Sequence, residues 1–230
     1  MKVYEMHLKL FLLKNVHFEE ARETICKLID KSLLKDEQMK KFHEKNKYKF
    51  YTFNSFYPLE KDKLYKAGNI YTILIRTIDE NLVKHFKTYL VNEYTEELKA
   101  LTIKERVIPK RVIEKIYTIS PAVMKCEKGY WKNNINVNQF EKRIKENLIK
   151  KYNEFFNTKI NEEFQLFNFV KFENKLPIPC NYKNIKFLGD KLTLMIDSSE
   201  EAQKLAYLAL GAGVAELGAR GYGFCNYKWI

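Results

Sequence analysis

The order of hydrophobic patterns along this 230-residue chain occurs twice, and this repeat most restricts the fold that the chain can adopt. Runs of β-branched and aromatic side chains in the first half predict strands at residues 3–14, 48–57, 69–78 and 97–109. Apolar residues at helical spacing predict helices at residues 18–33 and 80–91, with a short polar helix over 36–43. The order of the main elements is therefore βαββαβ.

The second half repeats this order from about residue 112. Strands are predicted at 115–119, 164–172 and 222–230, a strand pair over 185–196 turns at 188–190, and an inserted hairpin turns at 127–129. A helix begins at Asn138, and another over 202–210 follows a capping box of Ser198 and Glu201. We therefore expect an α+β fold of tandem ferredoxin-like (RRM-like) βαββαβ domains, residues 1–110 and 111–230, each large enough to bury a core.

Basic residues outnumber acidic ones by 41 to 29, which gives the chain a net charge of +12. Such a surplus predicts attraction to a polyanion, and nucleic acid is the simplest partner of this kind. A composition biased towards Lys, Asn, Ile, Tyr and Phe explains the same surplus without any partner. The charge alone therefore decides nothing.

The cysteines and the apolar segments narrow the class of protein further. Cysteines stand at positions 26, 126, 180 and 225 without a CxxC pair, which predicts buried thiols and neither a zinc site nor a disulfide framework. Polar residues interrupt the amino-terminal apolar run, unlike a secretion signal, and no segment reaches the ~20 apolar residues that span a bilayer. We expect a cytoplasmic protein with no membrane partner, metal or cofactor.

Five of the eight glycines cluster near the end of the chain, in the sequence LGAGVAELGARGYGF from Leu210 to Phe224. Glycine tolerates positive φ and lets phosphate oxygens approach backbone N–H groups, and Arg220 adds a planar set of donors. The segment from Gly211 to Gly223 is therefore predicted to hold a phosphodiester backbone. It lies between a helix and a strand and lacks GK[ST], so it is neither a Walker loop nor a dinucleotide fingerprint. A plain crossover from helix to strand is the alternative.

With this ending, the tandem order and a basic helix in the second half, the sequence resembles the CRISPR-associated endoribonucleases that cut precursor CRISPR RNA within its repeats, the sixth Cas family. The resemblance spans the whole chain. It is carried by Gly221-Tyr222-Gly223-Phe224 after the glycine-rich loop, by Phe42-His43-Glu44 with the strand from Lys49 to Asn54, and by Ser120-Pro121. Two departures from the family pattern are the seven residues between Gly213 and Gly221, and Asp30, which stands where some members carry a catalytic tyrosine.

The resemblance implies metal-independent cleavage, in which the ribose 2′-OH attacks the adjacent phosphate and leaves a 2′,3′-cyclic phosphate and a 5′-OH. That reaction needs a base, an acid and positive charge beside the phosphorane. Histidine suits the proton transfers because its pKa lies near neutrality. His43 is the catalytic candidate implied by the resemblance, with Lys49 to stabilise phosphate charge and Tyr51 or Tyr48 as helpers.

The other three histidines are predicted at positions that suggest no catalytic role: His7 within a strand, His17 at a helix start, and His85 on a solvated helix face. Candidate RNA-binding residues are the loop residues Gly213, Gly218, Arg220, Gly221 and Gly223, and the helix residues Lys142, Arg143 and Lys145. Lysines around the predicted hairpin (Lys125, Lys128 and Lys132) are further candidates. Lys150 and Lys151 are predicted on the same basic side of the helix.

The partner that the resemblance implies is CRISPR repeat RNA, as precursor and as mature CRISPR RNA. Other subunits of a type I effector complex are further possible partners, and the protein is expected as a monomer or homodimer. The alternative function is a non-catalytic ferredoxin-like RNA-binding subunit of a CRISPR effector complex. A metal-dependent nuclease is disfavoured because the sequence has no clustered carboxylates or H-x-H motif.

Overall fold

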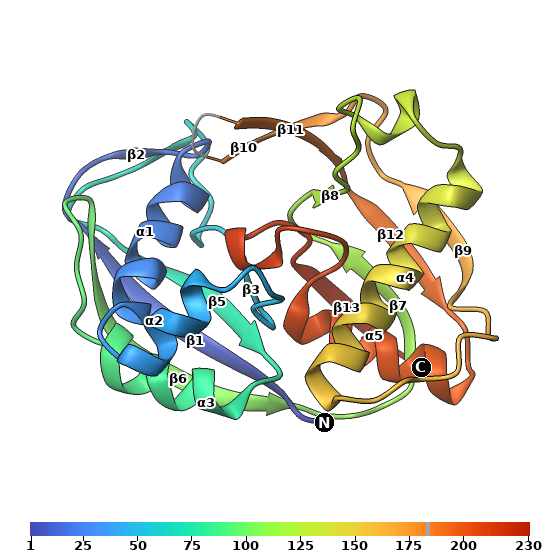
Figure 1. Ribbon diagram of the computed structural model, residues 1–230. Coiled ribbons are helices and arrows are strands. Elements are labelled where there is room, and N and C mark those ends of the chain that lie inside the picture. Colours follow the sequence, from blue (N-terminus) through green and yellow to red (C-terminus); the bar gives the residue numbers. More distant parts are fainter. Residues whose placement is uncertain (183–184) are drawn as a thin grey trace.

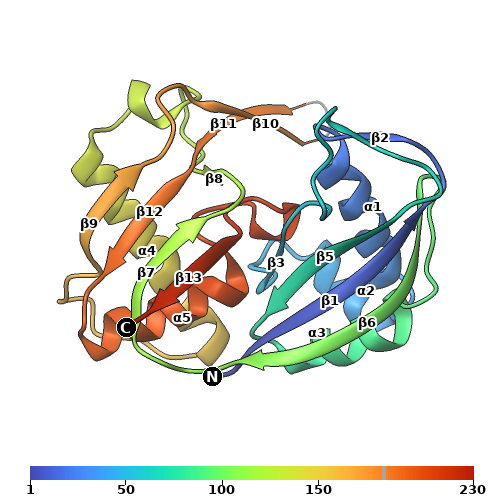
Figure 2. The same ribbon diagram turned by 180° about the vertical axis from the view of Figure 1, so that it is seen from behind.

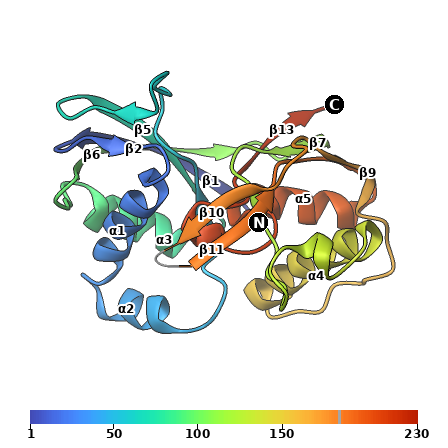
Figure 3. The same cartoon turned by 90° about the horizontal axis from the view of Figure 1, so that it is seen from above.

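The computed structural model describes residues 1–182 and 185–230. Its main strands form two four-stranded antiparallel sheets, one from each half of the chain, and Figure 1 shows these halves side by side. Figure 3 shows the helices of the first half and the long helix of the second half on the same side of the strands. The predicted mixed α+β class with two sheet-based halves is confirmed.

The first sheet has the strand order β3-β5-β1-β6. The elements of the first half are β1 (Val3–Leu12), β2 (Val16–His17), α1 (Ala21–Leu33), α2 (Glu37–Glu44), β3 (Tyr51–Phe53), β4 (Leu64–Tyr65), β5 (Ile70–Thr77), α3 (Glu80–His85), a π-helical turn η1 (Phe86–Leu90) and β6 (Leu98–Ile108). Leaving aside α2 and the short pair β2-β4, their order is βαββαβ.

The pattern of side chains on β1 explains why this strand lies at the centre of the sheet. Met6, Leu8 and Leu10 are fully buried, whereas His7 and Lys9 between them are more exposed, as expected for a strand with one face against the helices. β1 pairs with β5 on one side and with β6 on the other. The alternation in the sequence therefore reports the buried face of the sheet correctly.

The second sheet has the strand order β13-β7-β12-β9. The elements of the second half are β7 (Ile113–Thr118), β8 (Ala122–Val123), a 3₁₀ turn η2 (Trp131–Asn133), α4 (Val137–Phe156), β9 (Phe167–Phe172), β10 (Ile178–Tyr182), β11 (Ile185–Asp190), β12 (Leu192–Ile196), α5 (Glu200–Ala212), a 3₁₀ turn η3 (Gly218–Arg220) and β13 (Cys225–Trp229). Strands β10, β11 and β8 form a separate three-stranded sheet, and Figure 2 shows the main strands of both halves from behind.

One of the two predicted turns in the second half is wrong. β11 and β12 do not pair with each other, because β11 joins β10 and β8 while β12 joins β7 and β9. Gly189 lies within β11, where a Cβ would sit 2.7 Å from the carbonyl oxygen of Ala122, so this glycine permits close strand approach and does not make a turn. The turn predicted at 127–129 does form: the N–H of Gly129 donates to the carbonyl of Cys126 at 3.1 Å, and one antiparallel bridge joins these two residues.

The helix caps also differ in part from prediction. The side chain of Asp36 accepts a hydrogen bond from the N–H of Met39 and so starts α2. A capping box does form at α4, between Asn136 and Gln139. None forms at α5, where the N-cap is Ser199 and its side chain makes no cap hydrogen bond.

α5 joins the two halves. Gly211, predicted to open the glycine-rich loop, lies in the last turn of α5, where a Cβ would approach Ile78 of the first half to 2.7 Å. The hydroxyl of Tyr207 accepts from the N–H of Val3 and donates to the carbonyl of Ile108. The start and end of the first sheet are thereby attached to the second half. Among the described residues, no helix has the length and apolarity needed to cross a membrane.

Candidate active site

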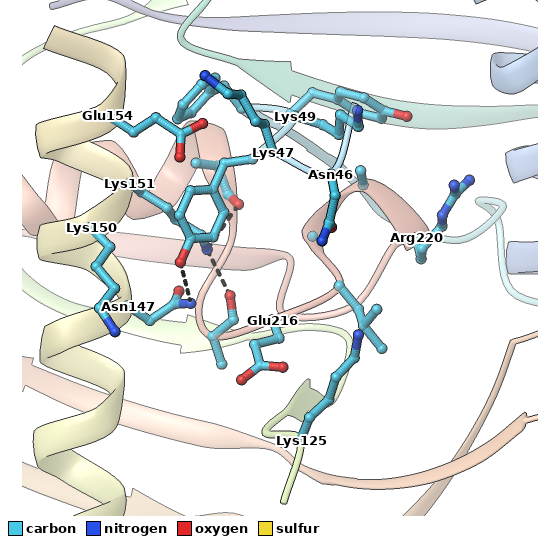
Figure 4. A pocket seen from close by; sticks show the side chains of 18 of the residues that line it. Asn46, Lys47, Lys49, Lys125, Asn147, Lys150, Lys151, Glu154, Glu216 and Arg220 are labelled. Atoms are coloured by element: carbon cyan, nitrogen blue, oxygen red, sulfur yellow. Dashed lines mark hydrogen bonds between the residues drawn. The ribbon is translucent and has the colours of Figure 1, made fainter. Parts of the chain in front are cut away.

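A cleft of about 690 Å³ lies between the halves, and several of the predicted site residues line it. Its lining residues come from the segment between the end of α2 and β3, from α4, from the loop after α5, and from Lys125 after β8. Figure 1 shows where these elements lie in the fold. Figure 4 shows Asn147, Lys151 and Glu154 of α4 on one side and Arg220 on the other. The basic side chains that line the cleft are Lys47, Lys49, Lys125, Arg143, Lys150, Lys151 and Arg220.

The balance of charge in the cleft favours an anionic ligand. Among the described lining residues, seven lysines and arginines face three acids, which are Glu146, Glu154 and Glu216. The whole chain has 41 basic and 29 acidic residues, so the cleft is enriched in positive charge relative to the chain. Low-dielectric walls strengthen such a field, and the cleft therefore attracts a polyanion.

His43 is in the last turn of α2 and lines the cleft. Its side chain is 21% exposed, and its Nδ1 lies 3.7 Å from Oδ1 of Asp30 on α1. The same carboxylate receives Nη1 of Arg220 at 2.7 and 2.9 Å, from the loop after α5. Asp30 thus connects the candidate histidine of the first half with the arginine of the second.

Lys49 supports the histidine instead of pointing freely into the cleft. Its ammonium donates to the carbonyls of His43 at 2.9 Å and Lys45 at 2.6 Å, and also to the carbonyl of Phe42. These are carbonyls at the end of α2, where the helix dipole favours a cation. Burial lowers the pKa of Lys49, and nearby Arg220 lowers it further. Lys49 therefore fixes the end of the helix that carries His43.

The two tyrosines differ in their access to the cleft. Tyr51 is 2% exposed, and its ring packs edge-on against Phe86 in the first core. Burial raises its pKa well above the usual value, so its hydroxyl stays neutral. Both tyrosines line the cleft, but Tyr48 is only half-buried, and its hydroxyl accepts a hydrogen bond from Asn147 at 3.4 Å. Of the two predicted helpers, the hydroxyl of Tyr51 is the one enclosed by the protein.

The glycines of the terminal loop mainly allow the loop to fold against the protein. Gly213, Gly221 and Gly223 have positive φ, and a Cβ on Gly223 would lie 1.9 Å from the carbonyl oxygen of Val214. Their N–H groups donate to carbonyls of the protein itself: Gly213 to Ala209, Gly221 to Gly218, and Gly223 to Pro121. The part of the loop that lines the cleft is residues 215–220, which include Gly218 and Arg220 of η3.

The predicted basic residues of α4 separate into three environments. Arg143 lines the cleft, donates to the carbonyl of Lys125 and lies 3.6 Å from Glu216. Lys142 is exposed and pairs weakly with Glu146 along the helix. Lys145 donates to carbonyls of the segment that follows α4. The structure therefore brings only Arg143 of these three to the cleft.

The lysines around the predicted hairpin also divide. Lys125 lines the cleft, whereas Lys132 packs over aromatic rings, among them Trp131 at 5.5 Å. Lys128 lies at the tip beside Gly129, and its N–H donates to Asn134. Lys125 is thus the member of this group that joins the candidate site.

Among the residues of the site, Lys151 differs most from its predicted position. It was expected on the solvated basic side of the helix, but it is 4% exposed, and its ammonium donates to the carbonyls of Gly213 at 2.8 Å and Ala215 at 2.7 Å. Burial lowers its pKa to about 7. Its spacing from Ile144 and Leu148 places it on the apolar stripe, so a signal was present in the sequence. Lys151 supports the start of the glycine-rich loop.

The remaining histidines lie outside the cleft. His7 is on the face of β1 away from the helices, with Nε2 3.1 Å from Glu5, and His17 is in β2. The predicted solvated position of His85 is wrong, because it is 5% exposed and its Nε2 contacts the carbonyl of Ser32 at 3.0 Å. Within the described part of the chain, no three His, Cys, Asp or Glu side chains are grouped to hold a metal ion.

The chemistry available in this cleft follows from these positions. A partly exposed imidazole can donate or accept a proton near neutral pH. Around it lie cations that can bind phosphate oxygens, Arg143 and Arg220 from the second half and Lys47 from the first. Proton transfer beside a bound phosphate is the reaction type that such an arrangement supports.

Comparisons with known proteins identify the family and the fold. A family model described as CRISPR associated protein Cas6, C-terminal, matches residues 103–227. A solved structure titled CRISPR associated protein Cas6 has a TM-score of 0.73 and 19% identity, over 98% of this chain and 99% of the other. The family resemblance inferred from the sequence is confirmed. No curated protein sequence matches the chain.

Two further solved structures share the fold. A structure titled "An RAMP protein binding different RNA substrates" has a TM-score of 0.73 and 17% identity, over 98% of this chain and 99% of the other. A Cas6-related protein from Pyrococcus furiosus has a TM-score of 0.72 and 13% identity, over 98% of both chains. At these identities the likeness concerns the fold, and it extends over both halves.

Proposed function

This chain belongs to the Cas6 family of CRISPR-associated proteins, and from that premise we propose that it is a metal-independent endoribonuclease that cleaves precursor CRISPR RNA within the repeats. Attack of the 2′-OH on the adjacent phosphate gives a 2′,3′-cyclic phosphate and a 5′-OH. The observation that carries the proposal is His43: among the described residues it is the one histidine that lines the basic cleft between the halves. It serves as the general acid or base.

The other candidate residues take roles that fit their contacts. Lys49 holds the end of α2 and contributes positive charge near the reacting phosphate. Arg143, Arg220 and Gly218 bind RNA at the cleft, with Lys125 and Lys150 beside them. Gly213, Gly221 and Gly223 maintain the loop that presents η3, and Lys142 and Lys145 act outside the cleft through long-range attraction. Tyr51 supports β3 from within the core and takes no part in proton transfer.

We assign residues 1–110 and 111–230 to two ferredoxin-like domains. The support is the βαββαβ order in each half, with its own four-stranded sheet. The first domain contributes the histidine, and the second contributes the terminal loop and α4. The partner is CRISPR repeat RNA, before and after cleavage, and other subunits of a type I effector complex bind the same RNA.

One observation favours a second function, that of a non-catalytic RNA-binding subunit of such a complex. The Tyr51 hydroxyl is buried and the Lys49 ammonium is bound to helix carbonyls, so these two groups leave proton transfer to His43 alone. A protein that binds repeat RNA tightly and leaves it intact would fulfil this second role.

The first test is cleavage of repeat RNA in EDTA by the wild type and by His43→Ala. General acid–base catalysis contributes about 10²–10⁴-fold, so we expect the single-turnover rate of the variant to fall by that factor while its RNA affinity changes little. His17→Ala, whose histidine lies outside the cleft, is the matched control and should cleave normally.

Two outcomes would decide against the proposal. If neither wild type nor variant cleaves but both bind, the non-catalytic function is correct. If cleavage appears only with added Mg²⁺, the mechanism is wrong. A single 2′-deoxy nucleotide at the cut site should abolish the reaction, because it removes the nucleophile.

A further inference from the structure

The carboxylate of Asp30 has two partners from different halves of the molecule. Arg220 donates through Nη1 to both carboxylate oxygens, at 2.9 and 2.7 Å. Nδ1 of His43 lies 3.7 Å from Oδ1, which is beyond hydrogen-bond length. In the free protein the Asp30 carboxylate is therefore hydrogen-bonded to Arg220, and the His43 side chain lies next to it without a hydrogen bond.

Arg220 can reach a ligand from its present position. It lines the cleft and is 20% exposed. A guanidinium binds phosphate as readily as carboxylate, through the same planar set of donors. A phosphate that enters the cleft thus competes with Asp30 for Arg220.

The backbone around this pair stays in place if the arginine side chain changes partner. The loop is fixed to α1 by other contacts: Sγ of Cys26 with the carbonyl of Ala219, and the guanidinium of Arg22 over the ring of Tyr222 at 4.9 Å. Lys49 independently fixes the backbone of His43. An exchange of partners at Asp30 therefore requires side-chain movement only.

We infer that Asp30 is a positioning residue for His43 once RNA is bound. A phosphate of the RNA binds Arg220 in place of Asp30, and the Asp30 carboxylate then accepts a hydrogen bond from Nδ1 of His43. That bond selects one tautomer and orients Nε2 toward the substrate, as a carboxylate does for a catalytic histidine elsewhere. This inference deepens the proposed function and rests on it. It makes correct alignment of His43 dependent on bound substrate.

The test follows the Nδ1 resonance of His43 by NMR, with a 2′-O-methylated CRISPR repeat RNA as a ligand that cannot be cleaved. In the wild type, RNA should move this resonance. In Asp30→Asn, which cannot accept the same charged hydrogen bond, the movement should be lost. In Arg220→Met, the free protein should already show the RNA-bound position, because Asp30 has lost its competing partner.

Activity and binding supply a second, separate readout. Loss of an orienting partner typically costs about 10–100-fold, so Asp30→Asn should slow single-turnover cleavage by that factor. Its affinity for the methylated RNA should be unchanged or slightly higher, since the Asp30 carboxylate no longer competes with phosphate for Arg220. A structural role would instead lower affinity, rate and melting temperature together.

Failure of the inference can be told apart from failure of the proposed function. If the wild type does not cleave, the endoribonuclease proposal fails. The NMR comparison still decides whether RNA binding changes the partner of the Asp30 carboxylate from Arg220 to His43. If the His43 resonance responds to RNA equally in wild type and Asp30→Asn, the inference is overturned even in an active enzyme.

Discussion

Two arginines connect the halves of this protein, and they do so in opposite environments. Arg76 of β5 is buried, with Nε 2.7 Å from Glu5, Nη2 2.9 Å from the Asn226 side chain, and Nη1 donating to the carbonyl of Cys225 in β13. Arg220 reaches the other way, from the second half to Asp30 of the first, at the rim of the cleft. The contacts of Arg76 are buried, whereas the ion pair of Arg220 lies at the cleft.

The two arginines differ in whether the guanidinium group is free to bind a ligand. All three nitrogens of Arg76 are bonded, and its plane packs over the ring of Phe224 at 4.5 Å, so a ligand has nothing to compete for. Arg220 shares its carboxylate with His43 and lines the cleft. An enclosed ion pair fixes geometry, whereas a partly exposed pair beside a titratable group can respond to a ligand.

The largest effect on stability is expected from Arg76→Met. Removing one partner of a buried ion pair typically costs about 3–5 kcal/mol, and Glu5 would keep only the more exposed partners Arg106 and His7. Urea unfolding measures this loss. The folded fraction should still cleave RNA at the normal rate, because Arg76 is not among the residues that line the cleft. A loss of unfolding free energy below about 1 kcal/mol would show that the buried contacts of Arg76 do not hold the two halves together.

Arg220→Met should show the converse pattern. A hydrogen bond to a charged group contributes about 1.5–3 kcal/mol, so RNA affinity should fall by roughly 10–100-fold. Unfolding free energy should fall by less than about 1 kcal/mol, because the pair with Asp30 is partly exposed. Lys142→Met, outside the cleft on α4, is the control for charge alone and should change affinity much less.

Lys151→Met tests whether the loop at the cleft has support besides Arg220. The substitution leaves the carbonyls of Gly213 and Ala215 without their donor, which costs about 1–3 kcal/mol, partly offset by removal of a buried charge. We expect a net loss of about 1 kcal/mol in unfolding free energy and weaker RNA binding. Lys150→Met, the neighbour whose side chain is exposed, should leave stability unchanged.

The smallest effect is confined to acid. Burial alone would raise the pKa of Glu5, but Arg76 and Arg106 outweigh it and the pKa is lowered from 4.5. Its carboxylate therefore adds stability that is fully present above pH 4.5 and is lost as the pH falls through the folded-state pKa. Unfolding free energy measured from pH 7 to pH 3 should decline more steeply in the wild type than in Glu5→Gln. Parallel curves would contradict this assignment.

Much of the fold could be read from periodicity, because β1, β5 and α4 each have a buried face that recurs at the spacing of its element. The errors arise where one residue type serves two purposes. Gly189 signalled a turn but permits close approach of β8 to β11. His85, between two lysines, suggested a solvated face, yet its imidazole contacts the carbonyl of Ser32 on α1. Local sequence does not distinguish these cases.

The site was less predictable than the fold. His43 came from the family resemblance and not from its own surroundings, and its role stays a prediction. The contact between Asp30 and Arg220 joins residues 190 positions apart, and no local pattern reports such a pair. Arg76 left a weaker signal, as the only charge within the apolar run from Ile70 to Thr77. A lone charge in a buried strand indicates a partner but does not say which one.

The same separation of 190 positions has a consequence for synthesis. At about 5–20 residues per second, a ribosome makes Arg220 roughly 10 to 40 s after Asp30. During that interval α1, α2 and His43 exist without the loop that completes the cleft. A nascent chain therefore carries no complete cleft until the segment after α5 has been made.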